Sequence, residues 1–211
     1  MSDIISQLRA VKTVPVIRTS TAKAAERAVD ILAEQGFTCF ELTMTTPDAV
    51  NIIKNLSQKS GILVGAGTVL NQADLHAVAD AGAKFIVSPA IVDGMAADCK
   101  QLGLPYMPGT STPTEVLRAH TDGAEVVKLF PAGLLGGPAF VKTMLSVFPD
   151  IIFMPTGGVT PENMLDYLAA GALCVGMGGN LVNDKALQAG DDDVIHQAAQ
   201  QVQAILAGAA S

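Results

Sequence analysis

Short apolar segments recur along the chain, and longer amphipathic segments separate them. Eight segments of four to seven residues are almost continuously apolar. Both faces of each predicted strand should therefore be buried, as in a parallel sheet that is covered by helices. The predicted strands are residues 13–18, 38–43, 62–68, 84–89, 104–107, 125–131, 151–155 and 173–176.

Helices are predicted between these strands, where capping residues precede and glycines follow the amphipathic segments. Thr19-Ser20-Thr21 supplies N-cap residues for one helix, which Gly36 ends, and Asn71 caps another, which Gly82 ends. The predicted helices are residues 3–11, 22–35, 47–56, 72–81, 92–102, 113–120, 139–148, 161–170 and 193–207. Eight strands that alternate with eight helices, after a short N-terminal helix, favour an α/β fold in which residues 1–211 form one (β/α)8 TIM barrel domain.

The composition supports one sizeable core and argues against two classes of partner. Of the 211 residues, 49% are hydrophobic, and the formal net charge is -7. An acidic chain lacks the basic surface that binds nucleic acid or an anionic membrane, and no apolar run reaches the length of a membrane span. Residues 1–8 lack the apolar core of a signal peptide. The three cysteines, Cys39, Cys99 and Cys174, fit neither a disulfide framework nor a zinc pattern, so we expect a reducing cytoplasm.

One charged residue interrupts the apolar strand at residues 125–131. In a strand, Val126, Lys128 and Phe130 point to the same face, so the Lys128 ammonium has apolar neighbours. Loss of hydration disfavours the charged form and lowers the pKa of a lysine, and a neutral amine attacks carbonyl carbons. Lys128 is therefore a candidate Schiff-base nucleophile. The alternative is a lysine at a strand end that reaches solvent or a carboxylate.

Distinctive residues recur at the ends of the predicted strands. In a barrel the active site lies at the C-terminal ends of the strands, so this recurrence predicts a site there. Glu41, a lone carboxylate in an apolar strand, is either a general acid/base beside Lys128 or half of a structural ion pair with Arg18 or Lys128. The full set is Arg18, Glu41, Thr43, Thr45, Thr68, Pro89, Lys128 and Phe130.

Two glycine-containing stretches follow the seventh and eighth predicted strands. They are Thr156-Gly157-Gly158 and Gly176-Met177-Gly178-Gly179-Asn180. Glycines let backbone N–H groups converge on an anion, and barrels often bind phosphate after these two strands. Each stretch alone is typical of a turn, but together they predict a site for phosphate or a similar anion.

The sequence contains no convincing pattern for a metal, a nucleotide cofactor or a serine-hydrolase triad. His76, His120 and His196 lie in predicted helices without ligand spacing and are expected at the surface. Gly65-Ala66-Gly67 lacks the third glycine of a dinucleotide-binding fingerprint. We therefore expect no metal and no cofactor, and we expect Cys39 and Cys174 to be core residues.

Seven motifs occur in an order that is characteristic of one family. They are Pro15-Val16-Ile17-Arg18, Glu41-Leu42-Thr43, Gly65-Ala66-Gly67-Thr68-Val69, Ile86-Val87-Ser88-Pro89, Pro108-Gly109 with Thr112-Pro113-Thr114-Glu115, Lys128-Leu129-Phe130-Pro131 and Pro155-Thr156-Gly157-Gly158. Together they resemble the 2-keto-3-deoxy-6-phosphogluconate (KDPG) aldolase / 4-hydroxy-2-oxoglutarate (KHG) aldolase family, over nearly the whole chain. The resemblance implies a class I, metal-independent aldolase on a (β/α)8 barrel that assembles as a homotrimer.

The resemblance also implies roles for individual residues. Lys128 is expected to form the Schiff base with pyruvate, and Glu41 to move protons while the carbinolamine and the enamine form. Thr68 matches a residue that contacts the pyruvyl carboxylate, and Phe130 and Pro89 match walls of the pocket. The positions that match the phosphate site of the family are Gly157, Gly158, Gly178 and Gly179.

Two regions depart from the family pattern. Many members carry an arginine just after the Glu-x-Thr motif, where it binds the substrate carboxylate, but here Met44-Thr45-Thr46 occupies that region. We predict that Arg18 supplies this charge from the first strand. Many members also carry serine or threonine in the last phosphate loop, where this chain has Gly179-Asn180 and keeps only backbone donors. The remaining predicted substrate-binding residues are Thr43 and Thr156.

The predicted function is cleavage of KDPG to pyruvate and glyceraldehyde 3-phosphate through a Schiff base on Lys128. Within the family, the alternatives are cleavage of 4-hydroxy-2-oxoglutarate or of the galactonate-series epimer, because C4 stereochemistry depends on fine pocket shape. From another class, a phosphate-binding barrel isomerase or epimerase needs a second carboxylate or cysteine opposite Glu41, and none is well placed. A non-catalytic anion-binding barrel leaves Lys128 and Glu41 without a purpose.

Overall fold

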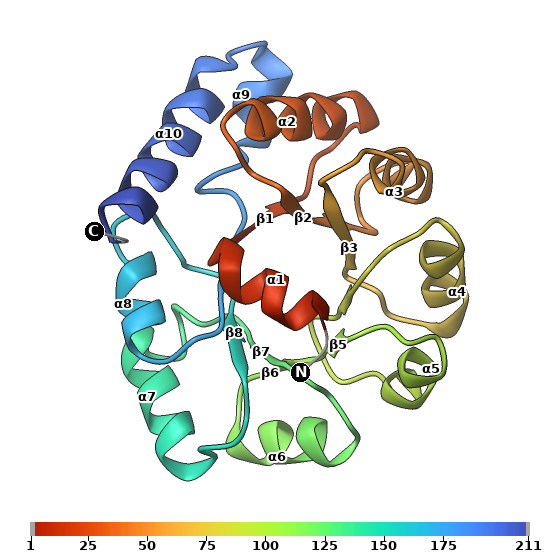
Figure 1. Ribbon diagram of the computed structural model, residues 1–211, viewed down its shortest axis with the longest axis vertical. Helices are drawn as coiled ribbons and strands as arrows, with labels where there is room; N and C mark the ends of the chain where they lie inside the picture. Colours follow the sequence, from red (N-terminus) through yellow and green to blue (C-terminus); the bar gives the residue numbers. More distant parts are fainter. Residues whose placement is uncertain (1–2, 210–211) are drawn as a thin grey trace.

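The computed structural model describes residues 3–209, in which parallel strands and helices alternate along the chain. Figure 1 shows the strands grouped at the centre and the helices from α2 onward arranged around them in chain order. The strands are β1 (Thr13–Ile17), β2 (Cys39–Thr43), β3 (Leu63–Gly67), β4 (Ile86–Val87), β5 (Tyr106–Met107), β6 (Gly109–Thr110), β7 (Val127–Leu129), β8 (Phe153–Pro155) and β9 (Val175–Met177). The helices are α1 (Asp3–Val11), α2 (Ala22–Glu34), α3 (Ala49–Ser57), α4 (Gln72–Asp80), α5 (Met95–Gln101), α6 (Pro113–Thr121), α7 (Pro138–Val147), α8 (Met164–Ala169), α9 (Asp184–Ala189) and α10 (Asp193–Gly208).

The paired strands are all parallel, so the predicted α/β fold with a parallel sheet is confirmed. Hydrogen bonds join six strands in the order β5-β4-β3-β2-β1-β9 and three in the order β6-β7-β8. Within residues 3–209 the structure therefore has two sheets, where we expected a single closed one.

The two sheets adjoin each other at two places, between β5 and β6 and between β8 and β9. Pro108 separates β5 from β6, because proline has no N–H to donate to a neighbouring strand. β5 keeps two residues of the predicted strand 104–107, and β6 lies beyond the end of that prediction. At the other junction, Thr156 follows β8 and forms an isolated parallel bridge to Gly176 of β9. The sheets are thus linked by the chain on one side. On the other side they are linked by this bridge and by the Leu173 N–H, which donates to the Phe153 carbonyl at 2.9 Å.

Several predicted elements are shorter or shifted. β4 keeps only two residues of the predicted strand 84–89, and α5 and α8 each begin three residues later than predicted. Before α8, a turn replaces the first predicted helical residues, and in it the Thr160 N–H donates to Asn163 Oδ1 at 2.8 Å. The sequence analysis missed α9, because its six residues are too few to show helical periodicity, although Asn183 caps its start and Gly190 its end.

Side chains of alternate strand residues form two apolar clusters, one on each side of the sheets. The outer cluster lies between the strands and the surrounding helices and includes Phe40, Ile86 and Phe153. The inner cluster combines strand residues with two residues of α1, which Figure 1 shows lying across the centre of the strands. It consists of Ile5, Leu8, Val14, Cys39, Leu63, Phe85, Val87, Met107, Val126, Met154, Leu173 and Cys174. α1 therefore closes the end of the interior from which the strands start.

The predicted capping residues fix where several helices begin, and hence how each strand end is presented. Thr21 accepts a hydrogen bond from the Ala24 N–H at 3.2 Å, and Asn71 accepts one from Asp74 at 2.8 Å. At the start of α6, Thr112 and Glu115 form a reciprocal capping box. These bonds satisfy N–H groups that the first helical turn leaves unpaired.

The cysteines and histidines divide between core and surface. Cys39 and Cys174 lie in the inner cluster, as predicted for core residues, and Cys99 lies in the outer one. His76 and His120 are exposed, as predicted. His196 is half-buried instead, with Nδ1 at 3.3 Å from the Gln35 side-chain amide.

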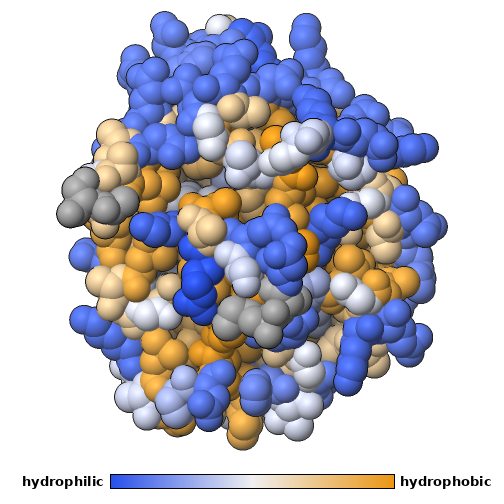
Figure 2. All heavy atoms as spheres, in the orientation of Figure 1, coloured by the Kyte–Doolittle hydropathy of each residue, from blue (hydrophilic) through white to orange (hydrophobic). Residues whose placement is uncertain are grey.

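The surface carries polar and apolar regions on the face that contains α1. Figure 2 shows hydrophilic residues over α2 and α9 at the top of the view, and apolar residues around and below α1. Of the helices between residues 3 and 209, none combines the length and apolar character needed to cross a bilayer.

Candidate active site

Glu41 and Lys128 face the same interior from different sheets. Cys39 precedes Glu41 by two residues and Val126 precedes Lys128 by two, and both belong to the inner cluster, so the alternation of a strand directs both ionisable groups inward. Glu41 is 1% exposed and Lys128 is 4% exposed. Two buried ionisable groups therefore lie above the apolar layer that α1 closes.

The backbone of Lys128 is fixed on both sides. Its N–H donates to the Pro108 carbonyl at 3.0 Å, and its carbonyl accepts from the Thr110 hydroxyl at 3.1 Å. The Lys128 Nζ lies 4.9 Å from the centre of the Phe130 ring. Burial lowers the pKa of Lys128 below its ordinary value, the charge of Glu41 opposes this, and the charge of Arg18 adds to it. The backbone of Lys128 is thus held in place, and burial shifts the amine toward its neutral, nucleophilic form.

The carboxyl group of Glu41 shifts in the opposite direction. Burial raises its pKa above the ordinary value, while the positive charges of Lys128 and Arg18 oppose that rise. Its Oε2 atom is buried and has no hydrogen-bond partner among residues 3–209. A carboxyl group with a raised pKa and an oxygen atom that has no hydrogen-bond partner can take up and release protons, as a general acid/base must.

Arg18 stands at the open end of the interior. It directly follows β1, is exposed, and donates from a guanidinium nitrogen to the Thr68 hydroxyl at 3.1 Å. Thr68 follows β3 and has a φ of 57°, a left-handed conformation that is costly for a threonine. The structure thus brings the two predicted carboxylate-binding residues together.

Four other predicted residues surround Lys128 and Glu41 in different ways. Phe130 is half-buried beside the lysine, and Pro89 is half-buried with its carbonyl packed where a side chain at position 109 would lie. Thr156 is 6% exposed, and its buried hydroxyl has no partner within residues 3–209. Thr43 is fully buried, and its hydroxyl donates to the Ile17 carbonyl at 3.1 Å.

The two glycine stretches lie side by side. Gly157 and Gly158 have φ values of 86° and 80°, which favour glycine, and Gly158 packs against the backbone of Gly133. The Asn180 side-chain amide donates to the Val159 carbonyl at 2.8 Å and so joins the loop after β9 to the loop after β8. A Cβ atom at Gly179 would meet nothing within 4 Å, which leaves open space beside this loop.

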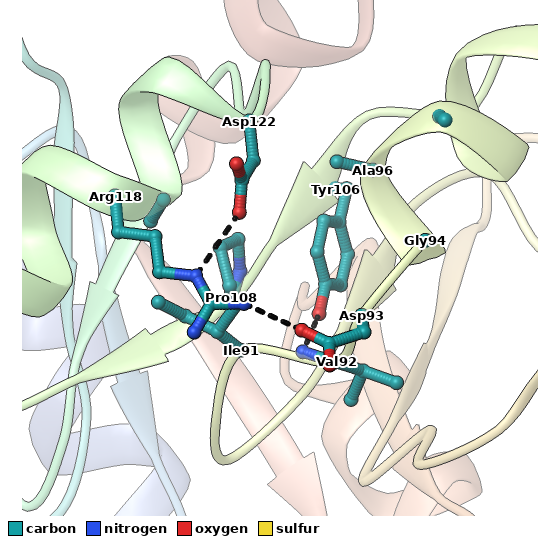
Figure 3. Close-up of a pocket in the computed structure, with 11 residues that line it drawn as sticks. Ile91, Val92, Asp93, Gly94, Ala96, Tyr106, Pro108, Arg118 and Asp122 are labelled. Carbon is teal, nitrogen blue, oxygen red and sulfur yellow. Dashed lines mark hydrogen bonds and ion pairs between the residues drawn. The ribbon is translucent and has the colours of Figure 1, made fainter.

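A separate groove lies between α5 and α6. It has a volume of about 240 Å³, and Figure 3 shows Arg118 of α6 reaching across it toward Asp93 and also pairing with Asp122 at the end of its own helix. The Tyr106 hydroxyl accepts a hydrogen bond from the Val92 N–H at 3.3 Å at the same place. None of the predicted site residues lines this groove, so it is distinct from the Glu41 and Lys128 interior.

Sequence reasoning missed two residues beside the site. Gly67 lies opposite Thr43 in the sheet, and a Cβ atom there would overlap the carboxylate of Glu41, so its missing side chain makes room for that group. Thr46 is 2% exposed and bonds to the end of β1. Thr46 could have been predicted, because it is a polar residue that follows a strand end. Gly67 could not, because its closeness to Glu41 depends on the register of β2 and β3.

The whole-chain pattern matches one family. Residues 4–198 match the family model described as KDPG and KHG aldolase. The chain belongs to the KDPG and KHG aldolase family. Among the described residues, no group of three or more His, Cys, Asp and Glu side chains is placed to hold a metal ion.

Relatives within the KDPG and KHG aldolase family span most of the chain. A 2-dehydro-3-deoxy-phosphogluconate aldolase of Pseudomonas aeruginosa is 38% identical over 170 residues, which are 80% of this chain and 77% of that protein. A KHG/KDPG aldolase of Escherichia coli strain K12 is 36% identical over 194 residues, 90% of this chain and 91% of that protein. The crystal structure of KDPG aldolase from Legionella pneumophila, with pyruvate captured as a covalent carbinolamine, has a TM-score of 0.86 at 28% identity, over 95% of this chain and 98% of that one.

Proposed function

We propose that the protein is a class I aldolase that cleaves KDPG to pyruvate and glyceraldehyde 3-phosphate, with Lys128 as the nucleophile and Glu41 as the general acid/base. One observation carries this proposal. A lysine and a carboxyl group are both buried in the same interior. Burial lowers the pKa of Lys128 and raises the pKa of Glu41, so it favours the neutral form of each group. Relatives that are named for this reaction support it.

The proposed reaction uses one amine and one proton carrier. The neutral Lys128 amine attacks the C2 ketone, and loss of one water from the carbinolamine leaves an iminium ion. Glu41, directly or through a water molecule, removes the C4 hydroxyl proton; the C3–C4 bond breaks, the aldehyde leaves, and the bonding electrons form an enamine. Protonation at C3 and addition of one water then release pyruvate and restore the amine.

Substrate binding is assigned to residues around this pair. We assign the pyruvyl carboxylate to Arg18 and Thr68, since a cation and a hydroxyl meet there at the open end. Phe130 and Pro89 are assigned to the walls of the pocket, and the unpaired Thr156 hydroxyl to a polar group of the substrate. The phosphate is assigned to backbone N–H groups near Gly157, Gly158, Gly178 and Gly179.

Cleavage of 4-hydroxy-2-oxoglutarate is the second candidate, and one observation favours it. The last loop has Gly179 without a hydroxyl, and the Asn180 amide is already bonded to Val159. Side-chain donors for a phosphate are therefore few. Turnover of KDPG, its galactonate epimer and 4-hydroxy-2-oxoglutarate in parallel separates these substrates.

We also propose that the two sheets belong to one closed (β/α)8 barrel domain. The bridge between Thr156 and Gly176 and the continuity of β5 with β6 through Pro108 support closure.

We further propose that the protein is a homotrimer. Light scattering after size-exclusion chromatography measures the assembly, and a monomer or dimer mass argues against the trimer.

Borohydride trapping tests the proposed function. The protein is incubated with pyruvate and borohydride, and the modified residue is located by peptide mass spectrometry. A pyruvyl adduct on Lys128 is the expected result. Folded protein that gives no adduct in excess pyruvate overturns the Schiff-base mechanism and favours the phosphate-binding isomerase instead.

Gly67→Ala is expected to lower kcat by roughly 100-fold, because the added methyl group displaces the Glu41 carboxylate and a shift of about 1 Å costs that much. Gly208→Ala is the matched control, since a Cβ atom there meets nothing within 4 Å. Steady-state turnover of both variants measures the effect. A Gly67→Ala variant as active as the control contradicts the placement of Glu41.

The pH profile of kcat/KM is expected to rise through the lowered pKa of Lys128, because only the neutral amine reacts. Arg18→Met removes a positive charge that lowers this pKa, so the rising limb should move to higher pH. Arg27→Met, in a surface pair with Asp192, is the control and should leave the limb in place. Superimposable profiles for all three proteins contradict the coupling between Arg18 and Lys128.

A further inference from the structure

Four threonines gather where β1 and β2 end, and we call them the threonine cluster: Thr19, Thr43, Thr45 and Thr46. Thr19, Thr43 and Thr46 are 4%, 0% and 2% exposed, whereas Thr45 is exposed. Buried hydroxyl groups in proteins have hydrogen-bond partners, so the partners of this cluster indicate what it holds in place.

The hydroxyl groups of Thr43 and Thr46 converge on the end of β1, whereas the Thr19 hydroxyl donates to the Thr21 carbonyl at 2.9 Å. Thr43 Oγ1 lies 3.1 Å from the Ile17 carbonyl oxygen, and Thr46 Oγ1 lies 3.4 Å from the same atom. Thr46 Oγ1 also accepts from the Thr19 N–H at 3.3 Å. Thr43 Oγ1 also lies 3.0 Å from Thr45 Oγ1 and 3.3 Å from Thr46 Oγ1. With one proton per hydroxyl, Thr43 donates to Ile17 and accepts from Thr45, and the Thr46 proton lies between the Ile17 carbonyl and Thr43 Oγ1.

These bonds enclose Arg18. Ile17 precedes it and Thr19 follows it, so the peptide groups on both sides of Arg18 are bonded to the last residue of β2 and to the loop after β2. Arg18 itself is exposed, and an unrestrained arginine has many rotamers to lose when it binds a ligand. A fixed backbone on both sides reduces the motion of its side chain.

The same loop reaches the partner of Arg18. The Met44 N–H donates to the Gly67 carbonyl at 2.8 Å, directly before Thr68, and the Thr46 N–H donates to Thr43 at 2.9 Å to close the turn. The loop therefore fixes the residues next to both ends of the Arg18–Thr68 hydrogen bond. It carries no cation of its own, since it reads Met44-Thr45-Thr46.

We propose that Thr43 and Thr46 are positioning residues that hold Arg18 where it binds the substrate carboxylate. This inference rests on the proposed function, which assigns the carboxylate to Arg18. It also gives Thr43 a different task from the substrate contact predicted from the sequence, because its hydroxyl is directed at Ile17.

The test measures how adduct formation with pyruvate depends on pyruvate concentration, because pyruvate has the carboxylate and ketone without the phosphate. Thr43→Val and Thr46→Val remove one hydroxyl each and keep the branched shape. Each is expected to raise the half-saturating pyruvate concentration about fivefold to tenfold, the size of one lost neutral hydrogen bond, with the saturated rate within about threefold. Thr43→Ser should restore the wild-type value.

A double-mutant comparison distinguishes positioning from a general loss of structure. Arg18→Met should raise the half-saturating concentration on the order of 100-fold, and Thr43→Val should add nothing in that background. Thr13→Val is the control, because Thr13 is 1% exposed and its hydroxyl has no partner among residues 3–209. It should leave both constants unchanged.

Three results lead to different conclusions. If Arg18→Met leaves the half-saturating concentration unchanged, the carboxylate assignment of the proposed function is wrong. The positioning inference is overturned if Arg18→Met raises the half-saturating pyruvate concentration but neither Thr43→Val nor Thr46→Val does. It is also overturned if Thr43→Val raises that concentration further in the Arg18→Met background. If Thr43→Val does not fold, Thr46→Val with and without Arg18→Met carries the same comparison.

Discussion

Lys128→Met should lose turnover of the keto acid by on the order of 10⁵-fold or more, because a thioether has no amine to form the iminium ion. The fold should remain, since methionine fills a similar volume and is uncharged in a position that is 4% exposed. The pKa of Lys128 is lowered in the folded protein, so its protonated form costs stability near neutral pH, and methionine removes that cost.

Turnover, borohydride adduct formation and thermal unfolding measured together check this result. Lys142→Met, on the exposed side of α7, is the matched control and should keep full activity. A folded Lys128→Met protein with substantial residual turnover contradicts the nucleophile assignment. A loss of activity in the Lys142 variant as well shows that the loss of turnover is not specific to position 128.

Glu41→Gln should slow turnover by about 10²–10⁴-fold, the contribution of a positioned acid/base group. The amide has the same shape as the carboxyl group but cannot exchange a proton at the working pH. Because the Glu41 charge raises the pKa of Lys128, its removal should also lower that pKa and move the pH limb of pyruvate trapping to lower pH. The loss of turnover measures the proton transfer by Glu41, and the shift of the pH limb measures the effect of its charge on Lys128.

Steady-state kinetics and the pH dependence of trapping measure these effects. Glu34→Gln, an exposed residue of α2, is the control for the loss of one negative charge. A rate within about threefold of wild type makes Glu41 a structural residue, because acid/base groups contribute far more. An unmoved pH limb indicates that Glu41 and Lys128 do not interact.

The sequence was sufficient to predict the side of the sheet on which the two central residues lie. Lys128 and Glu41 each interrupt an apolar strand, and the two-residue period of a strand relates them to Val126 and Cys39 of the inner cluster. The family motifs then indicated which strand ends meet. Local patterns were enough here because burial on both faces leaves few ways to place a charge.

Features that depend on distances between strands could not be predicted from the sequence. The overlap of Gly67 with Glu41 and the bonds from Thr43 to Ile17 exist only once the register of β1, β2 and β3 is known. The short helix α9 was missed for a different reason, because caps without a periodic interior do not distinguish a helix from a turn. The break at Pro108 was visible as a proline, but its effect on sheet pairing was not predicted.

The position of α1 has a consequence for the order of events in the proposed reaction. Ile5 and Leu8 close one end of the interior with the inner cluster, and Arg18 is exposed at the other end. The sugar acid, the hydrolytic water and both products must then share one entrance. The pyruvyl part is covalently attached to Lys128 until water adds to the iminium ion, so the aldehyde departs first. The aldehyde and the hydrolytic water therefore use the same entrance in turn, and product release is sequential because pyruvate stays attached to Lys128 until the water has added.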